Sequence, residues 1–348
     1  MIYGIMKKTG LTTKELIFMI RFGIIGTGFI TDHFILSAKK TKAFKLSAIY
    51  SRSIEKAMSY GEKYDDDIKY FDDLEAMALS DDLDAIYIAS PNALHAPQSK
   101  LFLNHGKHVL VEKAAASNSR ELEEIISLAK EKNLVYMEAM KSLTMPAFLA
   151  LRENLPKIGK VRKYFGNYCQ YSSRYDRHKN GEFVNTFHKE FSNGSLLDIG
   201  IYCIYPLVAL FGIPKSIKAN AIILENGGID GCGSILMGYG DMEALITHSK
   251  ISNSYTPSEI QGELGSLLID KIGNPTELTL ILRDGTREVI RPNTIPEDMV
   301  YEIEEFMSLI NDQKIESEVN NFELALSVHK IMDEVRQQIG LVYPSDLL

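Results

Sequence analysis

Cysteine is scarce in this sequence, with three residues among 348 positions. Cys169, Cys203 and Cys232 are far apart, odd in number, and form neither a CxxC pair nor a zinc-ligand spacing. A disulfide framework and a cysteine-based metal centre are therefore not expected. We interpret the three residues as buried free thiols of a protein from a reducing compartment, and we predict no metal site.

An excess of positive charge is also lacking. The chain holds 38 lysine and arginine residues against 46 aspartate and glutamate residues, a formal net charge of −8. Proteins that bind nucleic acid through many phosphate contacts need basic surfaces, so no nucleic-acid partner is expected. With 45% apolar and 24% charged residues, the composition is that of a soluble globular protein.

Long apolar runs are missing from the pattern as well. We see no segment with the roughly 20 apolar residues of a membrane span, and no small-residue cleavage site follows the short run KELIFMI near the N-terminus. No membrane association and a cytoplasmic location are therefore predicted. Residues 1–18 are predicted to be an extension, because Met19 leads directly into the strand-like RFGIIG.

Strands and helices alternate in the first half. Strands are predicted at 21–26, 44–51, 68–71, 83–90, 108–113 and 135–140, with helices near 30–40, 53–63, 72–79, 94–105 and 118–132. This alternation indicates βαβ units and a parallel sheet. Chain length favours about two domains, and we place the first at 19–141.

The second half, 142–348, follows another pattern. Its β-rich segments come in succession at 161–171, 216–224, 232–239, 242–251, 257–262, 266–270, 276–282 and 287–291, and helices are expected at 144–155, 194–211, 296–311 and 321–338. Hairpin turn signals such as RDG at 283–285 join neighbouring strands. An antiparallel sheet with helices on one face is predicted. The fold class is α/β, with a parallel-sheet domain followed by an α+β domain.

The first chemical motif is GIIGTGFIT at 23–31. It follows a predicted strand and opens a helix, as the phosphate-binding turn of a dinucleotide site does. Gly26 permits the tight turn, and Gly28 lets a pyrophosphate approach the helix N-terminus. The alternative is an ordinary strand–helix turn. The predicted cofactor contacts in this motif are Gly26, Thr27, Gly28, Phe29 and Ile30.

The end of the second predicted strand bears on which dinucleotide is bound. NAD sites usually carry a carboxylate there for the ribose hydroxyls, whereas this chain has Ser51 and Arg52. Because an arginine can bind a 2′-phosphate, NADP is favoured over NAD as the cofactor. The alternative is a solvent-exposed Arg52, with Glu55 as the residue at the ribose.

Two more predicted strands end in polar residues, where ligands bind to parallel sheets. In SPNALHAP, Ser90, Pro91, Asn92 and His95 are predicted to face the cofactor or substrate, although Asn92 and His95 could merely cap a helix.

The next strand ends in Glu112 and Lys113, which point to opposite faces. The lysine could stabilise charge on a substrate oxygen, and a structural ion pair is the alternative. Glu112 and Lys113 are also counted among the cofactor contacts.

The second half offers partners for this lysine. In GSLLDIGIY, Asp198 and Tyr202 are four residues apart on a predicted helix, and with a nearby lysine they could relay a proton. A buried tyrosine bonded to an aspartate for structural reasons is the alternative. The polar segment 171–190 suits a polar ligand through Arg174, Tyr175 and His188, although a solvated loop is equally compatible.

Together, GIIGTGFIT, SPNALHAP, VEKAAA, MEAMK and GSLLDIGIY resemble the glucose–fructose oxidoreductase / inositol dehydrogenase / MocA (Gfo/Idh/MocA) family in order and spacing. The resemblance covers nearly the whole chain from Met19. It implies a Rossmann domain, a second domain with a large, mostly antiparallel sheet, and hydride transfer between NAD(P) and a sugar, cyclitol or related alcohol or carbonyl. SRS at 51–53, EAM at 138–140 and the tyrosine of DIGIY are most similar to the dihydrodiol dehydrogenase and glucose–fructose oxidoreductase branch.

The resemblance also assigns roles. Lys113 matches the family's catalytic lysine, Asp198 its aspartate, and Tyr202 its proton donor or acceptor. Ala114 stands where the family usually has a proline, which would fix φ and remove an N–H donor. Its loss puts in question what aims Lys113.

Two other departures concern the substrate. SNG at 192–194 replaces three glycines, and Lys141 stands where the dihydrodiol branch tends to carry an aromatic residue. Lys141 therefore joins Lys113, Asp198 and Tyr202 among the predicted substrate contacts.

An NAD(P)-dependent dehydrogenase or reductase of a sugar, cyclitol or dihydrodiol-type substrate is the predicted function. It is expected to be a homodimer or homotetramer built through the C-terminal sheet. The alternatives are an NAD-dependent glycosidase without net redox change and a non-catalytic, ligand-sensing regulator, although a regulator could dispense with the lysine and tyrosine.

Overall fold

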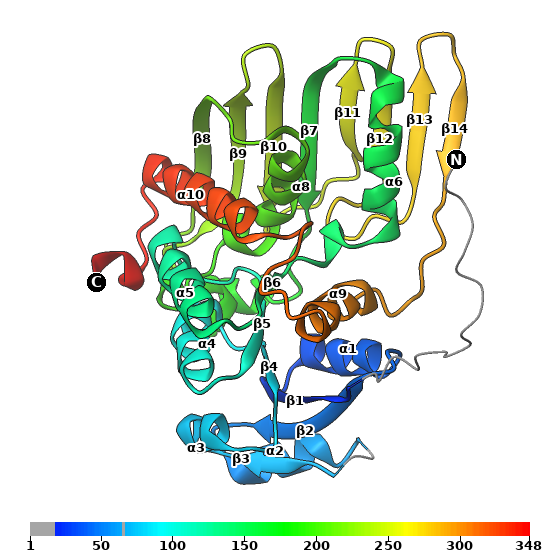
Figure 1. Ribbon diagram of the computed structural model, residues 1–348. Coiled ribbons are helices and arrows are strands. Elements are labelled where there is room, and N and C mark those ends of the chain that lie inside the picture. The colour runs from blue at the N-terminus through cyan, green and yellow to red at the C-terminus, as the bar shows by residue number, and fades with distance from the viewer. Residues whose placement is uncertain (1–17, 65–66) are drawn as a thin grey trace, which may run out of the picture.

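Six parallel strands form the first sheet of the computed structural model, which describes residues 18–64 and 67–348 (Figure 1). The strands are β1 Ile20–Ile25, β2 Phe44–Tyr50, β3 Lys69–Phe71, β4 Ala85–Ile88, β5 His108–Glu112 and β6 Tyr136–Ala139. Their order, β3-β2-β1-β4-β5-β6, is that of a dinucleotide-binding sheet. The predicted parallel sheet is thus confirmed, whereas the predicted extension lies, up to residue 17, outside the described residues.

Helices cover both faces of this sheet, which explains why its central strands are almost wholly apolar. They are α1 Phe29–Ala38, α2 Ile54–Gly61, α3 Leu74–Leu79, α4 His95–Asn104 and α5 Ser119–Lys132. On one face, Phe34 of α1 stacks on Tyr87 of β4 with ring centroids 3.7 Å apart. On the other, Phe102 of α4 and Ile125 of α5 are fully buried. The sheet is therefore packed on both faces beneath its carboxyl edge.

Helix α5 begins and ends where the sequence predicts. Asn118 accepts a hydrogen bond from the Glu121 backbone N–H at 2.9 Å, and Asn133 ends the helix in the left-handed conformation. The helix starts directly after the segment that carries Lys113, so its capped N-terminus fixes where that segment ends.

Eight strands form the second sheet. They are β7 Val161–Cys169, β8 Ser216–Ile223, β9 Asp230–Gly238, β10 Glu243–Ser249, β11 Ser258–Gly262, β12 Gly265–Ile269, β13 Leu278–Leu282 and β14 Arg287–Ile290. Their order is β14-β13-β12-β11-β7-β10-β9-β8, and every neighbouring pair is antiparallel except the parallel pair β7 and β10. The predicted, mostly antiparallel sheet is confirmed.

The helices of the second half divide between the two sheets (Figure 1). They are α6 Pro146–Asn154, α7 Tyr175–Lys179, α8 Ile201–Phe211, α9 Val300–Asn311 and α10 Phe322–Ile339. Helices α6, α8 and α10 pack on one side of the second sheet. Helix α9 instead returns to the first sheet, where Phe306 packs among the residues of β1 and α1. A domain boundary near residue 141 stays a prediction.

One prediction about apolar runs is corrected. Among the described residues, the stretch Lys189–Phe211 is long and apolar enough to cross a membrane, with a mean hydropathy of 1.7. Within its most apolar window, 67% is buried inside the protein. The stretch is apolar because α8 is packed between the second sheet and α10, as the core helix of a soluble protein is.

The cysteine prediction holds in part. All three thiols are free, but only Cys203 is buried. Cys232 lies on β9 in alternation with buried Ile235, on the same face as the exposed Leu236. This face of the sheet points away from the core, so its side chains are partly exposed to solvent.

Candidate active site

A crevice of about 1210 Å³ opens at the carboxyl ends of β1, β2, β4 and β5, where α7, the segment 183–193 and the start of α8 face the parallel sheet. This volume exceeds that of ordinary small-molecule pockets and leaves room for a dinucleotide together with a small substrate. Most of the sequence-predicted site residues line it: Gly26, Thr27, Gly28, Phe29, Ile30, Ser51, Arg52, Ser90, Pro91, Asn92, His95, Glu112, Lys113, Arg174, Asp198 and Tyr202.

The glycine turn has the shape that a pyrophosphate requires. Gly26 has φ of 111°, and a Cβ there would lie 2.5 Å from the Ala89 carbonyl oxygen, so only glycine fits. A Cβ on Gly28 would meet nothing within 4 Å, which means that the space before α1 is open. Gly28 is the N-cap of α1 and supplies no side-chain cap. The N-terminal N–H groups of α1 are therefore available to an anion.

Positive charge gathers where the second strand ends. Arg52 is exposed and lines the crevice together with Lys56. Neither side chain forms an ion pair with a residue that the structure describes. Glu55 is turned to Ser53, whose hydroxyl donates to its carboxylate at 2.5 Å. Among the described residues, this end of the crevice thus presents two cations without an ion-pair partner and no carboxylate, which suits a phosphate rather than a free ribose diol.

His95 and Asn92 bind the backbone. The His95 ring is 1% exposed, with Nδ1 2.8 Å from the Ala114 carbonyl oxygen and Nε2 2.8 Å from the Ser90 carbonyl oxygen. Burial lowers its pKa, so the ring is neutral and donates to one carbonyl at a time. The Asn92 amide donates to the Ser192 carbonyl oxygen at 3.0 Å. Neither side chain caps α4.

Lys113 lies at the centre of the crevice floor. Its Nζ donates to Asp198 twice, at 2.8 Å to Oδ1 and at 2.8 Å to the backbone carbonyl oxygen. An ammonium group has three N–H donors, so one stays available to a ligand. The peptide bond from Lys113 to Ala114 is cis.

Tyr202 stands beside this pair, with Lys113 Nζ 5.2 Å from the centre of its ring. Its hydroxyl makes no hydrogen bond with any residue that the structure describes. Asp198 lies in a π-helical turn, Leu196–Gly200, that leads directly into α8 and Tyr202. Such turns are rare and recur at functional sites. The three side chains that a proton relay needs therefore meet in one place.

The charges in this cluster are fixed by their neighbours. Burial opposes a charge on Asp198, but the ammonium groups of Lys113 and Lys250 outweigh it and hold its pKa far below the usual range. Burial likewise opposes the charge of Lys113, yet Asp198 raises the pKa of this lysine. Burial raises the pKa of Tyr202 above that of a free phenol, although the nearby Lys113 lowers it. The lysine is thus charged and the tyrosine protonated at neutral pH.

Glu112 faces away from this relay. Its carboxylate accepts a hydrogen bond from the Tyr87 hydroxyl at 2.5 Å, and burial raises its pKa. The residue is 8% exposed and lines the crevice beside Lys113. It supports the strand end.

Three sequence-predicted substrate contacts do not line the crevice. Lys141 bonds to Asp298 of the segment before α9 at 2.8 Å. Tyr175 stacks on Phe187, and His188 stacks on Phe183, inside the lobe formed by residues 171–191. The ion pair with Asp298 accounts for Lys141. Aromatic packing accounts for the other two, and Tyr175 borders a small apolar cluster that Phe187 forms with Ile229.

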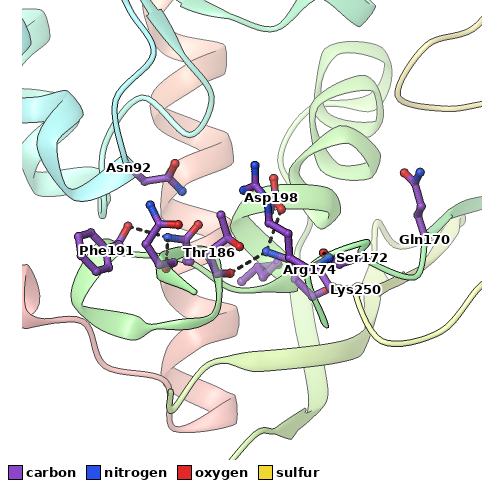
Figure 2. Close-up of polar contacts among 12 residues, drawn as sticks. Asn92, Gln170, Ser172, Arg174, Thr186, Phe191, Asp198 and Lys250 are labelled. Atoms are coloured by element: carbon purple, nitrogen blue, oxygen red, sulfur yellow. Dashed lines mark hydrogen bonds and ion pairs between the residues drawn. The ribbon is translucent and has the colours of Figure 1, made fainter. Parts of the chain in front are cut away.

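Sequence reasoning overlooked several residues of the crevice. It also overlooked Lys250, which does not line the crevice but supports it from behind; Lys250 is 2% exposed and lies directly after β10. Its Nζ is 2.9 Å from Asp198 Oδ2 and donates to the Thr186 carbonyl oxygen at 2.9 Å (Figure 2). No motif marks this lysine, because its partners come from distant segments. Lining residues that were not singled out include Lys56, Gln98, Arg177, Phe183, Asn185, Thr186, Phe191 and Asn193.

Comparison with known proteins begins with the N-terminal half. Residues 20–140 match the family model GFO_IDH_MocA, described as an oxidoreductase family with an NAD-binding Rossmann fold. The match ends at the last residue before Lys141 and thus contains the glycine turn, the Arg52 segment, His95 and Lys113.

Full-length relatives extend the match. The chain is 52% identical over 328 residues to the scyllo-inositol 2-dehydrogenase (NADP(+)) IolU of Bacillus subtilis (strain 168), covering 94% of this chain and 99% of that protein. It is 28% identical over 341 residues to the trans-1,2-dihydrobenzene-1,2-diol dehydrogenase of Mus musculus, with coverage of 94% and 99%. A levoglucosan dehydrogenase solved with NADH and levoglucosan shares the fold, with a TM-score of 0.83, 19% identity and coverage of 92% and 97%.

Proposed function

Because the chain belongs to the Gfo/Idh/MocA oxidoreductase family, we propose that it is an NADP-dependent dehydrogenase of a cyclitol or a similar polyhydroxylated alcohol. The observation that carries the proposal is the meeting of Lys113, Asp198 and Tyr202 at the carboxyl edge of a dinucleotide-binding sheet. A regulator that only senses a ligand has no need of a charged lysine beside a free tyrosine hydroxyl.

In the proposed reaction, the nicotinamide supplies or accepts the hydride when the cofactor is bound. Lys113 holds the substrate oxygen with its remaining N–H donor and stabilises negative charge there. Tyr202 takes the hydroxyl proton during oxidation and returns it during reduction. Asp198 keeps Lys113 charged and in place, while Gly28 and the N-terminus of α1 would hold the pyrophosphate of the cofactor.

NADP is the proposed cofactor because two unpaired cations border the end of β2. The relative with 52% identity carries NADP(+) in its name. Arg52 and Lys56 would bind the 2′-phosphate, with Ser51 beside them.

Replacing Arg52 by alanine is expected to weaken NADP selectively. A charge-assisted hydrogen bond contributes about 1.5–3 kcal/mol, so kcat/KM for NADP should fall by about 10- to 100-fold while that for NAD changes little. Steady-state kinetics with each cofactor measure the effect. Lys179→Ala, an exposed lysine that pairs with Asp176, is the control. Equal losses with NADP and NAD would remove Arg52 from the phosphate site.

The proposed substrate is a small ring compound with several hydroxyls, as scyllo-inositol is. Support comes from the relative named for that compound and from the polar side chains of Arg174, Asn185 and Asn193 around the crevice. Such groups hydrogen-bond to hydroxyls from several directions. Arg174 adds a guanidinium without an ion-pair partner among the described residues.

A spectrophotometric screen tests the function. Purified protein is mixed with scyllo-inositol, other cyclitols, sugars and dihydrodiols, each with NADP and with NAD, and the formation of reduced nicotinamide is followed. Turnover of a cyclitol with NADP is the expected result. A protein that cleaves glycosides with a tightly held NAD and no net absorbance change would instead be a glycosidase, and the proposal would be wrong.

A homodimer or homotetramer built through the second sheet is proposed as the working form. The face of this sheet that lacks α6, α8 and α10 carries the exposed apolar side chains Ile222, Leu236 and Val289. An open sheet face that carries apolar side chains, with Ile222 and Leu236 on the adjacent strands β8 and β9, is the surface we propose for this contact. Light scattering after size exclusion measures the mass, and a monomer at micromolar concentration would contradict the proposal.

The free thiols suit a reducing compartment such as the cytoplasm.

A further inference from the structure

Lys113 is followed by a turn whose geometry its own sequence does not fix. Residue 114 is alanine, so φ at this position is not restricted by a proline ring. Ala114, Ala115 and Ala116 are fully buried and offer no polar side chain that could hold the turn. Contacts from other segments must therefore fix the backbone of this turn, and with it the direction of Lys113, which directly precedes the turn.

The peptide group between Ala114 and Ala115 is held at both of its polar ends. The Ala115 N–H donates to Glu138 Oε1 at 2.8 Å. The carbonyl oxygen of the same peptide group lies 2.8 Å from His95 Nδ1. Both interactions are compatible with proline at position 114, since they use the next N–H and the carbonyl. Here they are the contacts that orient this peptide plane.

Glu138 also reaches the helix that carries Tyr202. It lies at the end of β6, paired with Val111 of β5, and its side chain is fully buried. Its second oxygen accepts a hydrogen bond from the hydroxyl of Tyr205. Tyr205 is on α8, one turn beyond Tyr202. One carboxylate therefore joins the turn after Lys113 to the helix of Tyr202.

The surroundings keep this carboxylate charged and immobile. His329 of α10 places Nε2 3.3 Å from both oxygens, and the Asn320 amide donates to the Glu138 backbone carbonyl oxygen at 2.7 Å. Burial opposes ionisation of Glu138, but the attraction of His329 and the hydrogen bonds from His329, Tyr205 and the Ala115 N–H lower its pKa. A buried, fully bonded carboxylate has little freedom to move.

We propose that Glu138 is a positioning residue, which sets the placement of Lys113 relative to Tyr202 by binding the Ala115 N–H with one oxygen and the Tyr205 hydroxyl with the other. It touches neither the crevice nor the reacting atoms. The inference rests on the function proposed above, because it concerns the geometry of the same relay. Small errors in that geometry are costly, since a displacement of about 1 Å can lower a rate on the order of 100-fold.

Kinetics of three variants test the proposal. Glu138→Leu should lower kcat about 100-fold, and Tyr205→Phe, which deletes one hydroxyl, about tenfold. Glu138→Gln keeps an oxygen for the Ala115 N–H, so its loss should be smaller than that of Glu138→Leu. The Kd for NADPH, measured by fluorescence, should stay within a factor of about two, because the glycine turn and Arg52, which would bind the phosphates, make no bond to Glu138 or Tyr205 in the described structure.

Tyr164→Phe is the matched control. Tyr164 is equally buried and its hydroxyl donates to the Cys203 carbonyl oxygen of α8 at 2.8 Å, but it does not reach Glu138. Its loss should lower the melting temperature without lowering kcat. If folded Tyr205→Phe and Glu138→Gln both kept the kcat of the wild type, the proposal would be wrong, even where Glu138→Leu failed to fold.

A stability cycle tests the same link without any substrate. Lys113→Met is made in the wild type and in Tyr205→Phe, and denaturant midpoints are compared. Changes in residues that do not share partners are additive, whereas a turn already loosened by Tyr205→Phe should make the effect of Lys113→Met smaller. Additive effects would overturn the positioning role. A wild type inactive on all substrates would instead overturn the proposed function and leave this result standing.

Discussion

Lys113→Met is expected to lower kcat by about 1,000-fold, the upper range for removing one charged donor at a reacting oxygen. Lys113 is the only lysine donor to Asp198 Oδ1 among the described residues, and its third N–H points to no other protein partner. Methionine has similar length and no charge, so the packing of the crevice floor is kept. Steady-state kinetics with NADP measure the loss, and a fluorescence titration measures cofactor binding.

Lys107→Met is the matched control for this variant. Lys107 is also largely buried and donates to two carbonyl oxygens, of Ser80 at 2.7 Å and of Leu83 at 3.0 Å, but it precedes β5 and lies at the amino edge of the sheet. It should lose stability and keep kcat. A Lys113→Met protein that bound NADP and turned over at the wild-type rate would remove this lysine from the chemistry.

Tyr202→Phe is expected to lower kcat about 100- to 1,000-fold, within the range of general acid–base catalysis. The variant removes a hydroxyl that makes no hydrogen bond with any described residue, so stability should change little. Its cofactor affinity should be unchanged, because Tyr202 belongs to α8 and not to the glycine turn. Tyr239→Phe is the control, since that hydroxyl donates to the Gly212 carbonyl oxygen at the end of the same helix.

The role of Tyr202 also predicts the direction in which the rate changes with pH. Burial raises the pKa of Tyr202, which outweighs the effect of Lys113. Oxidation needs the phenolate as proton acceptor, so the wild-type rate should rise with pH up to that pKa, whereas reduction needs the protonated form and should not rise. The rise should be absent from Tyr202→Phe. A rise that persisted in the variant would assign the proton to another group.

Loss of Lys113 and loss of Tyr202 should be non-additive. The two residues act on one oxygen, and catalytic groups that act as a unit do not contribute independently. The double variant is therefore expected to be about as slow as the slower single variant. An additive loss would mean that the two residues serve different steps.

Alternation of apolar runs with helical stretches was enough to predict the parallel sheet, because a strand that is buried on both faces needs apolar side chains at nearly every position. Turn chemistry at Gly26 and the missing carboxylate after β2 are local properties, since a φ of 111° and an unpaired Arg52 depend on few neighbours. Geometry placed Lys113 at the edge of the parallel sheet and Asp198 and Tyr202 on one helix face. That the three would meet was implied by the family resemblance.

Contacts between distant segments could not be predicted in this way. Lys250 reaches Asp198 across 52 positions of chain, and Glu138 reaches Ala115 and Tyr205 from a third strand, with no spacing that announces either. Lys141 and His188 are polar residues, but Lys141 bonds to Asp298 and His188 stacks on Phe183, and neither lines the crevice. The sequence by itself determined the sheet, the glycine turn and the residue types of the relay. Only the tertiary structure decided what holds Lys113 in place, because burial and long-range hydrogen bonds depend on how the two sheets pack together.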